Sequence, residues 1–167
     1  LGSSLYSARL AAERGLPYAF ASHFAPRLLL QAVELYRQNF RPSAQLDRPY
    51  VMIGVPLAAA PTDEEAEYLA SSQYQRVLGI LSGQRGLLPP PVAGFMEQLP
   101  AQHRAAILDF LAAGVIGGPA VVREGLLRLV ELTGADELML VCDIHDPALR
   151  LRALDIAAQA LADAFPQ

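Results

Sequence analysis

The sequence predicts an α/β fold in which helices cover a parallel sheet. Short apolar segments with strand character alternate along the chain with longer segments whose apolar residues recur at helical spacing. The strongest strand signal, Tyr50–Ala59, is apolar on both faces, as expected of a buried parallel strand. The chain has 167 residues, of which 53% are hydrophobic, and this is enough for one domain with a substantial core.

The first part of the chain predicts a helix, a strand and a second helix. Ser7–Arg14 has helical spacing and ends before Gly15, a residue that commonly terminates helices. Tyr18–Ala21 is short, apolar and aromatic, which is typical of a buried strand. Pro26 then opens a second helix over Arg27–Asn39, and a polar loop follows it.

The middle of the chain combines the strongest strand with a marked helix start. Pro56 lies near the end of that strand and is expected to mark the point where strand pairing stops. The stretch TDEE, from Thr62 to Glu65, predicts a capping box. In it the Thr62 hydroxyl accepts a bond from a free N–H, and Glu65 reaches back to the cap. The helix that starts there is expected to run to about Ser82.

The last part of the chain predicts three helices and one strand. A loop with three consecutive prolines leads to a helix over Ala101–Ala113. The stretch GVIGGPAVV then predicts a turn that places Pro119 in the first turn of a helix. That helix is expected to run to about Leu132 and to end at Gly134, followed by a strand over Glu137–Cys142 and a helix over Pro147–Ala164.

Composition argues against several classes of protein. All thirteen basic residues are arginines, they are scattered, and the net charge is −4, so no basic stripe is available to follow a nucleic-acid backbone. No apolar run reaches the length of a membrane span, and the start of the chain lacks a signal-peptide pattern. The single cysteine, Cys142, lies in an apolar run and predicts a buried thiol in a reducing cytoplasm. His23, His103 and His145 lie far apart and predict no metal site.

The opening stretch, LGSSLYSARL, predicts an anion-binding loop at the carboxyl end of a strand. Leu1 resembles the tail of a strand, Gly2 to Ser4 form a small polar turn, and Ser7 lies in the first helical turn. Backbone N–H groups at a helix start attract anions, and glycine lets the backbone come close to them. Serine at a helix start is also a common N-cap with no ligand, so both interpretations remain open.

Further polar and aromatic residues follow two other predicted strands. His23 and Phe24 come after Tyr18–Ala21, and Asp143 and His145 come after the last strand. Because the carboxyl ends of parallel strands meet at one rim, these residues predict a pocket there. A single histidine at such a rim is also common as a packing or capping residue, and this alternative stays open.

The stretch LGSSLYSARLAAERGLPYAFASHFAP closely resembles a block of the bacterial luciferase-like flavin monooxygenases, in the branch called group 1 luciferase-family oxidoreductases. Later stretches resemble the same family in order and spacing, namely LYRQNFRPSAQLDRPYVMIGV, TDEEAEYLASS, LPPPV, VREGLLRLVELTGADELML and DPALRLRALDIAA. The resemblance covers nearly the whole chain, and its first block is the most specific.

The resemblance implies a TIM (β/α)8 barrel, of which this chain holds the C-terminal half. Leu1 would lie at the end of the fifth strand, and residues 1–167 would form a single partial domain that ends with helix 8. Residues 83–118 would form an insertion on the active-site side that shields the site from water. Leu1 is not an initiator residue, which fits a truncated, cleaved or partial chain.

The resemblance also implies FMN as the cofactor. Its phosphate would be received by Ser3, Ser4 and Ser7, with Gly2 permitting close approach and Tyr6 helping to wall the site. His23 and Phe24 would face the flavin or substrate cavity. The residues around the flavin ring come largely from the first four strands in this family, and this chain lacks them. The catalytic residues are therefore unassigned.

These observations lead to an enzyme hypothesis. The chain would belong to a bacterial, cytoplasmic FMN-dependent monooxygenase that uses reduced flavin and O2 on an unidentified small organic substrate. A separate reductase or NAD(P)H would reduce the flavin. A half-barrel also needs a partner, which would be the missing N-terminal half or a second copy.

Three rival hypotheses stay open beside the enzyme. In the first, the half-barrel binds flavin or phosphate without turnover and forms oligomers through its open sheet edges. In the second, the chain is a remnant that retains the fold and binds nothing. In the third, it belongs to an enzyme that uses deazaflavin in place of FMN.

Overall fold

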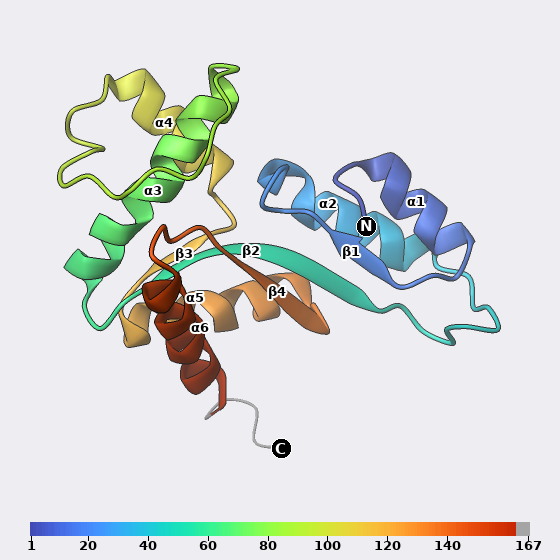
Figure 1. Cartoon of the computed structure of the whole chain (residues 1–167). Helices are drawn as coiled ribbons and strands as arrows, with labels where there is room; N and C mark the ends of the chain where they lie inside the picture. The colour runs from blue at the N-terminus through green and yellow to red at the C-terminus, as the bar shows by residue number, and fades with distance from the viewer. Residues whose placement is uncertain (163–167) are drawn as a thin grey trace.

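The computed structural model describes residues 1–162, and its centre is a parallel sheet of four strands (Figure 1). The strands are β1 (Tyr18–Phe20), β2 (Val51–Ala59), β3 (Val115–Gly117) and β4 (Glu137–Cys142). Strand β2 pairs in parallel with each of the other three. The register aligns Tyr18 with Val51, Leu57 with Val115, and Met52 with Glu137. The predicted α/β class with a parallel sheet is therefore confirmed.

Pairing along β2 explains why a proline is tolerated inside it. Strand β4 pairs with β2 over Met52–Leu57. Some residues of this stretch also pair with β1 and others with β3, so β1 and β3 both lie on the opposite edge of β2. On that edge the β1 pairing ends at Ile53 and the β3 pairing begins at Leu57. Pro56 lies in the gap between them, where no neighbour needs its missing N–H. The expectation that pairing stops at Pro56 was therefore wrong.

Strand β3 was not expected, because the sequence predicted a turn in this stretch. Val115 and Ile116 instead add to the free edge of β2, next to Ala58. The segment is short and glycines flank it, so it has little strand signal of its own. It becomes a strand because β2 extends beyond β1 and offers it unpaired backbone groups.

Six α-helices complete the described chain, with bounds close to those predicted. They are α1 (Leu5–Glu13), α2 (Leu29–Asn39), α3 (Asp63–Leu81), α4 (Ala101–Phe110), α5 (Pro119–Thr133) and α6 (Pro147–Ala162). A 3-10 turn over Pro26–Leu28 leads into α2. Helix α4 ends at Phe110 rather than at Ala113, and the end predicted at Ala164 lies outside the described residues. None of the helices in residues 1–162 is both long enough and apolar enough to cross a membrane.

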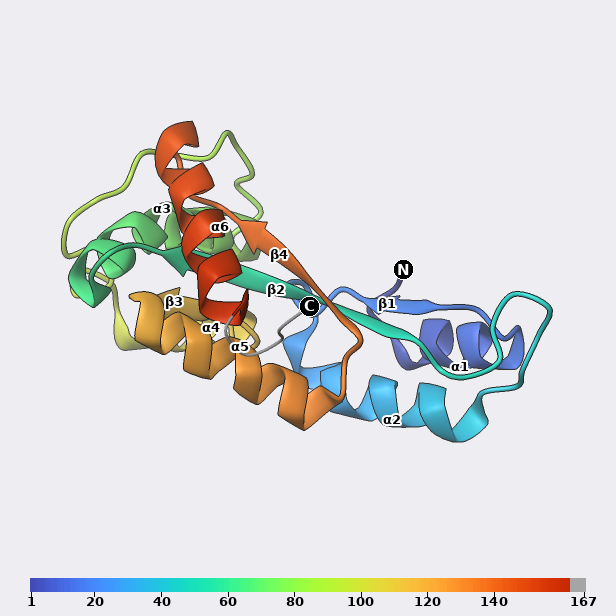
Figure 2. The same ribbon diagram turned by 90° about the horizontal axis from the view of Figure 1, so that it is seen from below.

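The two faces of the sheet differ in how they are covered. Tyr18, Phe20 and Ile53 are buried on the face where α1 and α2 pack, and the rings of Tyr18 and Tyr36 lie 5.3 Å apart there. Figure 2 shows α1, α2 and α5 along the same side of the sheet. On the opposite face Met52 is only half-buried and Met139 is 51% exposed. The helices therefore leave one apolar sheet face open.

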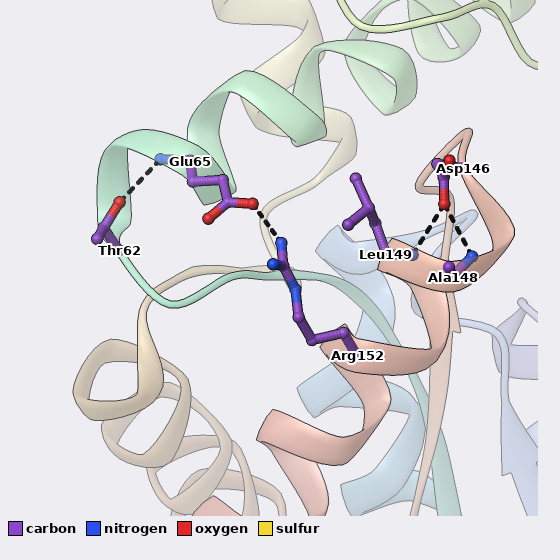
Figure 3. A network of polar contacts seen from close by, with 6 residues as sticks. All are labelled: Thr62, Glu65, Asp146, Ala148, Leu149 and Arg152. Carbon is purple, nitrogen blue, oxygen red and sulfur yellow. Dashed lines mark hydrogen bonds and ion pairs between the residues drawn. The ribbon is translucent and has the colours of Figure 1, made fainter.

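Hydrogen bonds cap the starts of α3 and α6, and one ion pair joins the two helices (Figure 3). The Thr62 hydroxyl accepts a hydrogen bond from the Glu65 N–H at 3.2 Å, as the capping box predicts. The Glu65 carboxylate does not complete that box, because it pairs instead with Arg152 of α6. At the start of α6 the Asp146 carboxylate accepts hydrogen bonds from the N–H groups of Ala148 and Leu149.

The C-terminus of α5 is closed by a glycine and by an arginine from another helix. Gly134 adopts the left-handed conformation, with φ of 57°. The Arg37 guanidinium of α2 donates hydrogen bonds to the carbonyl groups of Thr133 and Gly134. A cation at this end of a helix interacts favourably with the helix dipole. These bonds therefore fix α2 against α5.

We expect Gly134→Ala to lower the free energy of unfolding by about 1–2 kcal/mol, because an L-residue in the left-handed conformation is strained. The added Cβ would also lie 3.1 Å from the Arg37 guanidinium. Gly86→Ala is the matched control, since a Cβ there meets nothing within 4 Å. Urea denaturation of the two variants and the unmodified protein provides the measurement. Equal loss of stability in both variants would contradict the cap.

Candidate functional site

The opening loop lies beside the carboxyl end of β1. The Gly2 N–H donates to the Ala19 carbonyl at 2.9 Å, and the Ala21 N–H donates to the Gly2 carbonyl at 2.8 Å. These two bonds form an isolated parallel bridge between Gly2 and Phe20. Gly2 thus pairs with the edge of β1 in the way that the last residue of a preceding strand would. This role was expected of Leu1, with Gly2 already in the turn. The turn that follows is consequently held at the rim of the sheet.

Ser4 and Ser7 form a reciprocal capping box at the start of α1. The Ser7 N–H donates to Ser4 Oγ at 3.2 Å, and the Ser4 N–H donates to Ser7 Oγ at 3.3 Å. Ser7 Oγ also lies 3.0 Å from the Tyr18 hydroxyl, whose pKa is raised by burial. The N-cap interpretation is therefore confirmed for Ser4. The N–H groups of Leu5 and Tyr6 have no partner within the helix and are available to a ligand.

The remaining features of this loop suit an anion. A Cβ on Gly2 would lie 2.2 Å from Ser7 Oγ, so only glycine fits under the turn. Ser3 and Tyr6 are exposed, and the first turn of α1 contains no acidic residue. Backbone N–H groups and hydroxyls, with no carboxylate among them, are the donors that a phosphate needs. The residues present therefore fit a phosphate group. Its binding to Gly2, Ser3, Ser4, Tyr6 and Ser7 stays a prediction.

His23 follows β1 at the same rim and packs over a glycine of β2. A Cβ on Gly54 would lie 2.3 Å from His23 Nδ1, so the imidazole occupies the place of a side chain. His23 Nδ1 is buried and has no hydrogen-bond partner among residues 1–162. The preceding Ser22 donates from Oγ to the Gly54 carbonyl at 2.6 Å, which anchors this loop to β2. Phe24 lies next to the imidazole, with ring centroids 4.6 Å apart.

An ion pair from two other segments lies beside His23. Arg76 of α3 pairs with Asp143, which follows β4. The pKa of His23 is lowered, first by burial and then by the positive charge of Arg76, while Asp143 opposes the shift. The imidazole is consequently neutral near pH 7. Asp143 therefore belongs to the predicted rim cluster. His145 is exposed and does not line the small space that His23 and Asp143 share.

Arg76 was not among the predicted site residues. It lies inside a long helix, and its sequence neighbours give no sign of a special position. Its place at the rim depends on the path of α3 back over the sheet. Cys142, by contrast, packs against the core from β4, where burial raises the pKa of its thiol. It is only half-buried, so the predicted buried thiol is confirmed only in part.

A cavity of 760 Å³ opens between α3, α4 and the loop that joins them. Phe24 lines this cavity as well as the rim, so the two are neighbours. Leu87, Phe95 and His103 contribute from residues 83–118, the segment predicted to be an insertion. Figure 1 shows α3, α4 and this loop together at one end of β2, away from α1.

Comparison with known proteins identifies close relatives. The family described as luciferase-like monooxygenase matches residues 1–137. A "Luciferase-like monooxygenase" of Escherichia coli K12 is 43% identical, over 94% of this chain and 47% of its own length. The "Uncharacterized protein YvbT" of Bacillus subtilis is 44% identical, over 95% of this chain and 47% of its own length. The chain therefore spans about half the length of the curated relatives it matches.

Solved structures agree with this result. The crystal structure of apo-MsnO8 matches with a TM-score of 0.86 at 33% identity, over 99% of this chain and 50% of that chain. A type II Baeyer-Villiger monooxygenase in complex with FMN, the oxygenating constituent of 3,6-diketocamphane monooxygenase, shares the fold. Its TM-score is 0.64 at 20% identity, over 97% of this chain and 47% of that chain.

These structures are TIM barrels, so the sheet described here is the C-terminal half of such a barrel, as predicted. Gly2, β1, β2 and β4 correspond in order to neighbouring barrel strands. Together with the family match over most of its length, this establishes that the chain belongs to the luciferase-like monooxygenase family.

Proposed function

We propose that this chain is the flavin-phosphate-binding half of an FMN-dependent monooxygenase that acts with O2 on a small organic substrate. The observation that carries the proposal is the opening loop. In a chain of this family, a helix start with a required glycine, exposed N–H and hydroxyl donors and no carboxylate lies at the carboxyl rim of the barrel sheet. Active sites of TIM barrels lie at that rim. The FMN-bound monooxygenase of the same fold adds support.

In this proposal the loop residues divide into two roles. Ser3 and the N–H groups of Leu5 and Tyr6 contact the phosphate, because they are exposed at the helix start or lack partners within the helix. Ser4 and Ser7 hold the turn through their reciprocal bonds, and the exposed Ser4 hydroxyl also contacts the phosphate. Gly2 keeps the space beneath the turn open for Ser7.

The rim residues orient the substrate and exclude water. Reduced FMN, when bound, would supply the electrons that activate O2 for transfer of one oxygen atom to the substrate. His23 holds a neutral imidazole at the rim, because burial disfavours its charged form. Phe24, which is 55% exposed, provides an apolar wall between the rim and the large cavity. Residues 83–118 form the active-site-side insertion of a single partial domain, residues 1–167, and limit access of water.

The open sheet face supports a requirement for a partner. Met52 and Met139 lie on the face that would line the interior of a closed barrel. The relatives carry about as much additional chain as the part matched here. We therefore propose that an N-terminal barrel half, or a second copy, covers this face and that turnover depends on it. A non-catalytic half-barrel that binds flavin or phosphate is the second candidate, favoured by the same open face.

We expect Ser3→Ala and Ser4→Ala to weaken FMN binding by about 1.5–3 kcal/mol each, roughly 10- to 150-fold in Kd, because each removes a hydrogen bond to a charged phosphate. Quenching of flavin fluorescence during titration measures this Kd. Thr62→Ala is the matched control, since it removes an equivalent N-cap bond from α3, outside the loop. Unchanged affinity in both serine variants would remove them from the phosphate site.

We expect the stability of the protein to fall as the pH drops below the ordinary His23 pKa of 6.5. The pKa of His23 is lowered in the fold, so the unfolded chain binds a proton more readily. The stabilising contribution is complete above pH 6.5 and is lost as the pH falls through the lower folded pKa. Urea denaturation between about pH 5 and 8 should therefore give a shallower pH dependence for His23→Gln than for the exposed-site control His145→Gln. Identical profiles would argue against a buried, neutral His23.

A further inference from the structure

The large cavity has the size and the lining of a binding site for a small organic molecule. Its volume of 760 Å³ lies within the usual range of such sites, about 300–1,000 Å³. Phe24 provides apolar surface from the loop after β1, and Leu87 and Phe95 provide it from the loop between α3 and α4. The walls are the C-terminal half of α3, the following loop and α4. The cavity borders the rim through Phe24, which lines both.

The charged residues of this cavity are all of one sign. Arg76 and Arg85 line it, and its lining within residues 1–162 includes no aspartate or glutamate, although Asp143 just outside it pairs with Arg76. This is unusual in a protein whose net charge is −4. A cavity lined by one sign of charge with apolar walls attracts ligands of the opposite sign. The lining therefore selects for an apolar molecule that carries a negative charge.

Arg76 connects the cavity with the rim. One nitrogen of its guanidinium binds Asp143, while the side chain stays 40% exposed. A guanidinium has five N–H donors, so a single carboxylate partner leaves donors for a second acceptor. Arg76 also lines a small space beneath, which it shares with His23 and with Gln73. Gln73 is 3% exposed, and its Oε1 has no hydrogen-bond partner within residues 1–162. The side chains of Arg76, Gln73 and His23 therefore place polar atoms between the cavity and the rim.

Arg85 is the second cation and lies on the exposed loop after α3. Hydrogen bonds between arginine and a carboxylate are among the strongest in proteins, and the planar guanidinium can bind both carboxylate oxygens at once. We infer that the cavity binds the substrate of the proposed monooxygenase and that this substrate is an organic carboxylate with an apolar body. Its carboxylate contacts Arg85 and Arg76, and its apolar body lies against Phe24 and Phe95. This inference rests on the proposed function.

Calorimetric titration of the full chain with 4-phenylbutyrate and with its neutral amide, 4-phenylbutyramide, tests the charge requirement. The two probes share the apolar body and differ in the carboxylate. We expect the carboxylate to bind about tenfold more tightly, the gain typical of a hydrogen bond to a charged group. Arg85→Gln and Arg76→Gln should each reduce that preference. Arg128→Gln, an exposed arginine on α5 outside the cavity, should leave it unchanged.

Equal binding of the two probes, or equal loss of the preference in Arg128→Gln, would overturn the inference. Because Arg76 also pairs with Asp143, Arg85→Gln decides the question if Arg76→Gln unfolds. FMN titration of the same samples separates the two proposals. FMN binding without a carboxylate preference overturns the substrate class alone. A carboxylate preference without FMN binding overturns the proposed flavin function and, with it, the claim that the bound carboxylate is a substrate.

Discussion

The parallel pairing of β2 on both edges is the constraint on which the rest of the structure depends. It holds β4 along one edge and β1 and β3 at the two ends of the other. Each of these strands then brings its following segment to the same rim. Because Gly54 in the middle of β2 has no side chain, the rim also has room for His23. The positions of the opening loop, the histidine and the ion pair all follow from this one strand.

Much of this arrangement could be predicted from the sequence because it depends on local patterns. The apolar run of β2, the Thr62 cap and the glycine that ends α5 each act over a few residues, and the structure has all three. The opening loop and His23 were also placed at the rim, because in a parallel sheet the residue after a strand lies at its carboxyl end.

The features that sequence reasoning missed depend on contacts between distant segments. Strand β3 forms only because β2 extends beyond β1, which no pattern within GVIGG reveals. Glu65 pairs with Arg152, 87 residues away, instead of completing a local capping box. Arg76 reaches Asp143 across 67 residues of chain. A long polar side chain can form a hydrogen bond or ion pair with any of several residues. Which partner lies within reach is set by the tertiary structure and is not visible in the local sequence.

The connectivity of the sheet also has a consequence for chain entropy. The pairing of Tyr18 with Val51 closes a short loop, whereas that of Met52 with Glu137 closes a much longer one that contains the whole segment around the cavity. Loop-closure cost grows only with the logarithm of loop length, so this extra length costs about 1 kcal/mol. Residues can therefore be added to or removed from the segment between α3 and α4 at little thermodynamic cost. The cavity walls can be remodelled while the strand register beneath them is retained.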